Sequence, residues 1–283
     1  MKFGSIAAGS QESIDTAKQI LRDGGNAFDA SIGAVFTSMT SEFSLTGAGG
    51  AGVLLGSEKG ARPIVYDFFV NCPSKKIADI DFKKINIDFG NTTQSFYTGK
   101  GSTAVPGNIA GLLSIHKEKG KLPLKNILEP AISLAKDGIV LSKYQSYINT
   151  LIKPILIKSE TGKKLFIKNN KFLSEGDIFR NTNFSNFLEM IIKYGSDFFY
   201  KGEGAEIINK IYMNGGYLDK TNLKNYEVLK RKPLKIKIGD YEIFTNPAPA
   251  YGGPLMIFLL KILKQSNKLD VDIIHLIKAM ELT

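Results

Sequence analysis

Several residue types are scarce in this chain, and each scarcity excludes a class of protein. One cysteine, Cys72, rules out an internal disulfide framework. With only two histidines, His116 and His275, we expect no zinc site. We also expect no cofactor. No run of about 18 apolar residues occurs, so we expect no membrane-spanning helix. The start, MKFGSIAAGS, lacks the apolar segment of a secretory signal, which predicts a cytoplasmic protein, or a periplasmic or extracellular one if the natural start differs.

Arginine is scarce too, and this bears on the formal charge of +10. Of 37 basic residues, only four are arginines: Arg22, Arg62, Arg180 and Arg231. Proteins that read nucleic acids favour arginine forks and aromatic stacking. The lysines are spread along the chain in modest clusters, which is typical of a solvated surface. We therefore expect no nucleic-acid partner.

What is present is enough for a globular core. The 283 residues are 43% hydrophobic and 23% charged, which fits one large domain or two small ones. Ser10 is a predicted N-cap for a helix that Gly24 and Gly25 end. Asn26 should cap a second helix over residues 27–39, which is apolar on nearly every side. Such a helix is typically buried between layers, so the pattern indicates a multilayered fold.

The rest of the chain mixes helical and strand patterns. We predict strands at 53–55 and within 62–70, an irregular stretch over 77–101, helices at 109–118 and 124–136, helical pieces up to 212, a β-hairpin over 232–246, and helices at 255–263 and 271–282. The chain stops inside the last helix without a stop signal, which suggests a truncated chain. The mixture favours an α/β fold.

A glycine string, Gly47-Ala-Gly49-Gly50-Ala-Gly52, matches the G-x-G-x-x-G dinucleotide fingerprint. That fingerprint needs a strand before it and a helix after it, because the pyrophosphate sits at the helix N-terminus. Here a helix precedes and a strand follows. The glycines either allow close packing of strand and helix or let backbone approach a ligand. We expect Cys72 to be an inert buried residue, since nothing basic lies beside it.

The ordered motifs resemble a known family. Its members carry a helix ending I-L-R-x-G-G-N-A-x-D-A and a later G-x-G-G-x-G turn, which match residues 20–30 and 47–52. Further matches follow in the same order: Ala104-Val105-Pro106-Gly107, Ala110-Gly111-Leu112, Gly120 to Pro123, Pro130-Ala131-Ile132, Phe199-Tyr200-Lys201-Gly202, Gly215-Gly216, Arg231 to Leu234, Thr245-Asn246-Pro247 and Gly252-Gly253. Over residues 7–280 the chain is thus similar to the γ-glutamyltransferase (γ-glutamyltranspeptidase) family.

The resemblance implies a fold and a mechanism. The fold would be the large-subunit portion of a four-layer αββα Ntn-hydrolase sandwich, with a helical lobe at about 106–212. In this family a precursor cuts itself before a threonine, which becomes an N-terminal nucleophile with its own amine as base. The matches end before that threonine, and Thr283 is the last residue. We therefore expect residues 1–283 to contain no catalytic residue, to be inactive alone, and to need the missing small-subunit half as a partner.

One further departure concerns substrate binding. The family's D-F-R-E-x-A-P segment matches Asp67 to Pro73, so Phe69 stands where the family has an arginine. A phenyl ring cannot form the bidentate pair that an arginine makes with a carboxylate. Arg62 lies about 23 Å away along an extended strand at ~3.3 Å per residue, too far to substitute. The substrate-binding residues that the resemblance implies are Phe69, Asn71, Tyr251, Gly252 and Gly253; Phe69 and Tyr251 could equally be structural.

The function implied is that of an amide hydrolase or acyl transferase for γ-glutamyl or related acyl groups, with small glutathione-type substrates. Two alternatives stay open. One is a non-catalytic truncated homologue that binds a small molecule. The other is a nucleotide-binding enzyme that uses the glycine string.

Overall fold

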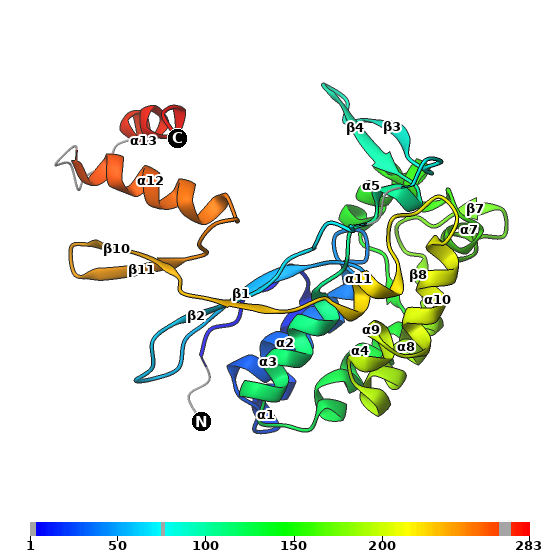
Figure 1. The fold of residues 1–283 in the computed structure, drawn as a ribbon, viewed down its shortest axis with the longest axis horizontal. Helices are drawn as coiled ribbons and strands as arrows, with labels where there is room; N and C mark the ends of the chain where they lie inside the picture. The colour runs from blue at the N-terminus through cyan, green and yellow to red at the C-terminus, as the bar shows by residue number, and fades with distance from the viewer. Residues whose placement is uncertain (1–3, 75–76, 266–272) are drawn as a thin grey trace. The chain divides into compact units, whose positions relative to one another are not determined.

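Figure 1 shows the computed structural model of the chain, which describes residues 4–74, 77–265 and 273–283. The chain forms two compact units. The first comprises the residues up to Ala51 together with Phe69–Glu227, and the second comprises Gly52–Phe68 together with the residues from Val228 on. Each unit is therefore built from two separate stretches of chain.

The first two helices begin where their capping residues predict. Helix α1 (Gln11–Arg22) has Ser10 as its N-cap, and the chain turns at Gly24 with a φ of 92°. Helix α2 (Ala27–Ser41) has a capping box, in which the Asn26 side chain accepts from the Asp29 N–H and the Asp29 carboxylate accepts from the Asn26 N–H. The α2 side chains Ile32 and Phe36 are completely buried, so the prediction of a buried second helix is confirmed.

Three neighbouring helices of the first unit pack against α2. It packs against α1, α3 (Asn108–Lys119) and α4 (Leu124–Asp137), and α4 also packs against α8 (Thr182–Tyr194). The remaining helices of this unit are η1 (Lys100–Ser102), α5 (Lys143–Leu151), α6 (Lys153–Leu156), α7 (Glu160–Phe166), α9 (Asp197–Tyr200), α10 (Glu203–Tyr212) and α11 (Lys220–Lys224). The predicted helices at 109–118 and 124–136 are confirmed.

Short strands join the helices between 139 and 179. Strand β5 (Ile139–Val140) pairs with β8 (Ile178–Phe179), and β6 (Ile167–Lys168) pairs with β7 (Lys171–Phe172). A buried cluster of large apolar side chains is formed by residues in these strands and directly beside them: Ile139, Leu141, Phe166, Leu173 and Phe179. The cluster anchors the start of α5 to the rest of the unit.

The prediction of an irregular stretch over 77–101 is wrong. Strand β3 (Lys83–Asp88) pairs in antiparallel fashion with β4 (Thr93–Thr98), and in Figure 1 this hairpin projects from the helices of its unit. The turn is closed by the Phe89 N–H, which donates to the Thr92 oxygen at 2.8 Å, and Gly90 has a φ of 89°. Only Ile87 of β3 is buried, so the strand lacks the apolar alternation that would have indicated it.

The second unit contains two antiparallel sheets. Strands β1 (Gly52–Gly56), β2 (Ile64–Phe68) and β9 (Leu229–Arg231) form one sheet in the order β1-β2-β9. Strands β10 (Leu234–Ile238) and β11 (Tyr241–Thr245) form the predicted hairpin, against which α12 (Gly252–Gln265) packs. Helix α13 (Ile273–Glu281) contacts α12. The first two residues of the helix predicted at 271–282 lie outside the described residues.

The structure is a mixture of helices and antiparallel sheets, which confirms the predicted α/β class. Within 4–74, 77–265 and 273–283, no helix combines the length and the apolar character needed to cross a membrane.

Candidate functional site

The segment that carries Phe69 and Asn71 leaves the end of β2 and is fixed through its backbone. The Tyr226 hydroxyl donates to the Phe69 carbonyl at 2.7 Å. Asn71 exchanges two backbone hydrogen bonds with Val105, at 3.2 and 2.8 Å. The Phe69 side chain is 60% exposed, whereas that of its neighbour Phe68 is only 4% exposed. Phe68 is therefore the core aromatic, and Phe69 presents its ring to solvent from a fixed backbone.

A second tyrosine, Tyr200, packs against Tyr226 and helps to fix this segment within the first unit. The buried Tyr200 hydroxyl donates to the Pro106 carbonyl at 2.8 Å and accepts from the Ala110 N–H at 3.3 Å. Its ring stacks on that of Tyr226, with centroids 5.6 Å apart. Burial raises the pKa of Tyr200 well above its usual range, so the hydroxyl stays protonated and remains a donor. The sequence analysis did not assign either tyrosine a role, although Tyr200 lies inside a motif that matched.

The glycine turn at residues 47–52 packs closely against the start of α3. The Gly50 carbonyl accepts from the N–H groups of Gly107 and Asn108, both at 3.0 Å. The Asn108 side-chain amide donates to the Gly47 carbonyl at 2.8 Å. A β-carbon on Gly50 would lie only 2.8 Å from the Nδ2 atom of Asn108. The turn leads into β1 and not into a helix. This geometry supports close packing, and it lacks the helix N-terminus that a dinucleotide requires.

The remaining predicted residues belong to the second unit. Tyr251 is 84% exposed, and α12 begins at Gly252. A β-carbon on Gly253 would lie 1.9 Å from the Asn246 carbonyl oxygen, whereas one on Gly252 would meet nothing within 4 Å. The helix start can therefore approach the Asn246 backbone because residue 253 has no side chain.

The five predicted residues are thus divided between the units. Phe69 and Asn71 lie in the first, and Tyr251, Gly252 and Gly253 lie in the second. Two arginines lie near Phe69, one in sequence and one on the paired strand β9. The one on β9, Arg231, forms an ion pair with Asp67, and its Nε lies 2.6 Å from the carboxylate. Arg62 precedes β2, in a loop. The prediction that Cys72 is buried is wrong, because this cysteine is exposed.

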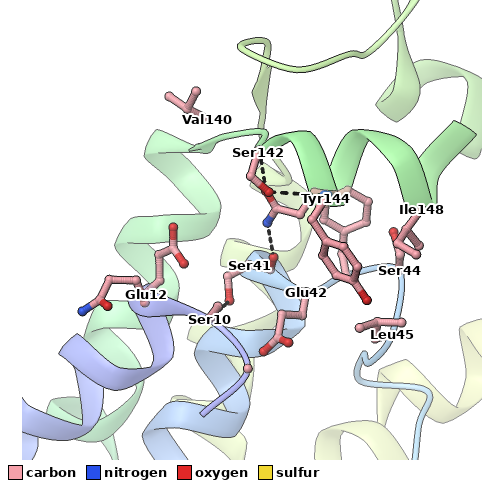
Figure 2. A pocket seen from close by; sticks show the side chains of 14 residues that line it. Ser10, Glu12, Ser41, Glu42, Ser44, Leu45, Val140, Ser142, Tyr144 and Ile148 are labelled. Carbon is pink, nitrogen blue, oxygen red and sulfur yellow. Dashed lines mark hydrogen bonds between the residues drawn. The ribbon is translucent and has the colours of Figure 1, made fainter. Parts of the chain in front are cut away.

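A separate cavity of about 370 Å³ lies within the first unit. Figure 2 shows it where the ends of α1, α2 and α5 meet. Its walls include two glutamates, Glu12 and Glu42, and the aromatic ring of Tyr144. Neither Phe69 nor Asn71 is among the described residues that line it. Across the described part of the chain, no group of three or more His, Cys, Asp or Glu side chains is arranged to hold a metal ion.

Comparison with known proteins agrees with the motif pattern. The family model described as gamma-glutamyltranspeptidase matches residues 13–282. Glutathione hydrolase 2 of Arabidopsis thaliana is 30% identical over 263 residues, which are 93% of this chain and 44% of that protein. The glutathione hydrolase proenzyme of Escherichia coli K12 is 29% identical over 266 residues, covering 93% of this chain and 45% of the relative.

Solved structures are similar as well. The gamma-glutamyltranspeptidase of Helicobacter pylori superposes with a TM-score of 0.86 at 25% identity, covering 99% of this chain and 82% of that one. The Bacillus anthracis transpeptidase CapD superposes with a TM-score of 0.81 at 24% identity, and this likeness supports a shared fold and nothing further. The chain spans less than half the length of the two curated relatives above. Because the family model covers nearly the whole sequence, the chain belongs to the gamma-glutamyltranspeptidase family.

Proposed function

We propose that this chain is the substrate-side part of an amide hydrolase or acyl transferase for γ-glutamyl or related acyl groups. The observation that carries the proposal is the family match over residues 13–282. Relatives named glutathione hydrolase and gamma-glutamyltranspeptidase support the same chemistry. Small glutathione-type molecules are the substrate class that we propose.

The nucleophile of this proposed enzyme is an N-terminal threonine beyond Thr283. Its hydroxyl attacks the amide carbonyl while its own α-amine takes the proton, so that an acyl-enzyme forms and an amine leaves. Water or a second amine then attacks the acyl-enzyme. The name proenzyme, given to the Escherichia coli relative and to others, supports a precursor that is cut. Residues 1–283 alone would then be inactive.

The exposed apolar surface of α12 and α13 supports a missing protein partner. Large apolar side chains on these two helices face solvent: Leu255, Met256, Phe258, Ile273, Ile274, Ile277 and Met280. Large apolar side chains exposed on two helices that contact each other are typical of an interface. We propose that the threonine-bearing half covers it.

The phenylalanine at position 69 bears on which acyl group the complete enzyme accepts. In the family pattern the arginine at this position pairs with the substrate carboxylate, and a phenyl ring cannot replace that charge. The backbone at Phe69 is held by Tyr226, so its ring is presented from a fixed point. We propose that the acyl group accepted by the complete enzyme is less charged than γ-glutamyl at this end.

The test compares residues 1–283 alone with a longer protein that also includes the residues encoded directly after Thr283. Turnover is measured with γ-glutamyl-p-nitroanilide and with butyryl-p-nitroanilide, which lacks the α-amino and α-carboxyl groups. We expect no turnover from residues 1–283, and turnover from the longer protein after self-cleavage. Replacing the new N-terminal threonine by alanine is the control, and it should abolish both cleavage and activity.

Turnover by residues 1–283 that survives repurification would overturn the proposed placement of the nucleophile. Saturable binding of either compound without turnover, in a protein that no threonine half follows, would instead favour a small-molecule binding module.

A further inference from the structure

The cavity between α1, α2 and α5 is built by side chains that cap helix ends. Ser10, the N-cap of α1, lies 2.8 Å from the Ser41 hydroxyl at the end of α2. The Gln145 amide donates to the Ser41 carbonyl at 2.5 Å, and Gln145 also completes the capping box of Ser142 at the start of α5. Three helices are therefore cross-linked by hydrogen bonds around the cavity, which is a preformed frame.

Two carboxylates face this cavity, and none of the described residues that line it carries a positive charge. Glu12 lies in the first turn of α1, and Glu42 is the C-cap of α2, at the negative end of that helix dipole. Figure 2 shows their side chains on either side of Ser10. Among the described residues, neither carboxylate has a hydrogen bond or an ion pair, and no lysine, arginine or histidine lines the cavity. Burial raises the pKa of Glu42, and the charge of Glu12 adds to the effect.

The described lining of the cavity holds no basic side chain, although the chain has 37 basic residues and 27 acidic ones. Glu42 also lies against the backbone of Gly9, where a β-carbon would come within 2.1 Å of its carboxylate oxygen. The carboxylate thus occupies space that a side chain at position 9 would fill. An external cation in the cavity would offset the repulsion between the two glutamates.

The rest of the lining is apolar and aromatic. Phe43, Leu45, Val140, Tyr144 and Ile148 form the walls together with the serines. Leu45 and Tyr144 are 64% and 62% exposed, which is high for large side chains. An aromatic ring beside a carboxylate suits an organic ammonium group, because the ring face also attracts a cation. A cavity of 370 Å³ lies within the range of small-molecule pockets, roughly 300–1,000 Å³.

We propose that this cavity binds a small organic cation, namely a primary amine or diamine with a short aliphatic chain. The ammonium group lies between Glu12 and Glu42, and the methylene groups contact Leu45, Tyr144 and Ile148. An amino acid fits poorly, because its carboxylate would lie near the two glutamates. A divalent metal also fits poorly, since two carboxylates fall short of the six or more oxygen ligands that calcium takes.

The absence of tryptophan from the sequence allows a direct binding assay. Tyr144→Trp keeps an aromatic ring in the wall and supplies a single fluorescent reporter. The probe is 1,4-diaminobutane, titrated into the full chain at constant ionic strength. Butylamine tests whether one ammonium group is enough, 1,4-butanediol provides an uncharged control of similar shape, and calcium chloride provides a metal control. We expect saturable changes with the two amines and none with the diol or calcium.

Variants locate the binding. Glu42→Gln and Glu12→Gln, each in the reporter background, should weaken diamine binding about tenfold or more, the order expected for losing a charged partner. Glu189→Gln makes the same charge change on the exposed surface of α8, outside the cavity lining, and should leave affinity unchanged. Leu45→Lys places an ammonium group at the exposed rim and should compete with the ligand. Thermal melts establish that each variant is folded.

Three outcomes would overturn the proposal. The first is no saturable signal at millimolar diamine, both by fluorescence and by calorimetry on the unmodified chain. The second is equal weakening by Glu189→Gln and Glu42→Gln, which would indicate general charge attraction. The third is saturation by calcium in preference to both amines.

Discussion

The carboxylate of Asp29 accepts hydrogen bonds from the backbone N–H of Lys121, 92 residues further along the chain, at 3.0 and 3.1 Å. The same carboxylate accepts from the N–H groups of Asn26 and Leu122. Asp29 is completely buried, so these N–H groups satisfy a charge that water cannot reach. One side chain therefore caps α2 and also holds the turn between α3 and α4.

This arrangement predicts a large loss of stability in Asp29→Ala. Three backbone N–H groups would lose their acceptor in a partly buried place, and we expect unfolding to become easier by about 3 kcal/mol. Urea denaturation followed by circular dichroism measures the difference. Asp15→Ala, on the exposed face of α1, is the matched control and should change stability by less than about 0.5 kcal/mol. A similar small effect for both variants would contradict the role given to Asp29.

The two glycines at the start of α12 should respond differently to alanine. Gly253→Ala places a β-carbon against the Asn246 carbonyl, and we expect a loss of about 1–3 kcal/mol because backbone must move. Gly252→Ala meets open space and should be neutral or slightly stabilising, since alanine favours a helix. Hydrogen exchange of the α12 amides measures both. Equal protection in the two variants would show that the approach to Asn246 is unimportant.

Glu42 should make stability depend on pH in the direction opposite to a salt-bridged acid. Its pKa in the folded chain is raised above 4.5, mainly by burial and then by Glu12, so the folded state favours its protonated form. The resulting penalty is absent at pH values below the unfolded pKa and grows as pH rises through the folded pKa. Glu42→Gln removes the charge, so it should melt at a higher temperature than the parent at neutral pH, with the difference vanishing in acid.

A second set of variants, made in a Glu12→Gln protein, tests the cause of this pH dependence. In Glu12→Gln the repulsive neighbour is gone, and the gain from Glu42→Gln should shrink while the burial contribution remains. Thermal melts from acid to neutral pH for the four combinations give the comparison. A Glu42→Gln variant that is less stable than the parent at neutral pH would mean that the carboxylate has a favourable partner.

The complete enzyme, as proposed above, should gain activity on γ-glutamyl compounds from Phe69→Arg. Charge-assisted hydrogen bonds contribute roughly 1.5–3 kcal/mol each, so a restored fork should raise kcat/KM for glutathione by on the order of 100-fold. The butyryl compound, which has no carboxylate for the fork to bind, should gain little. Phe69→Lys is the control, because it adds the charge without the planar fork. If the parent already prefers glutathione by orders of magnitude and Phe69→Arg brings no improvement, a basic residue elsewhere performs this role.

Local chemistry in the sequence determined where many elements begin and end. Ser10, Asn26 and Gly24 act on backbone groups within a few residues of themselves, so the limits of α1 and α2 were predictable. The Gly239-Asp240 turn between alternating apolar residues likewise predicted the β10–β11 hairpin. The ordered motifs were enough to predict the family, because each match constrains the next along the chain.

Tertiary structure decided the features that depend on residues far apart. The β3–β4 hairpin has polar strands, so its pairing could not be read from periodicity, and the exposure of Cys72 depends on how its segment pairs with Val105. Tyr200 reaches Pro106 across 94 residues, and Glu12 and Glu42 meet only because α1 folds back on α2. Local propensity carries no information about such distant pairs, since their energy appears only after the chain has closed the loop between them.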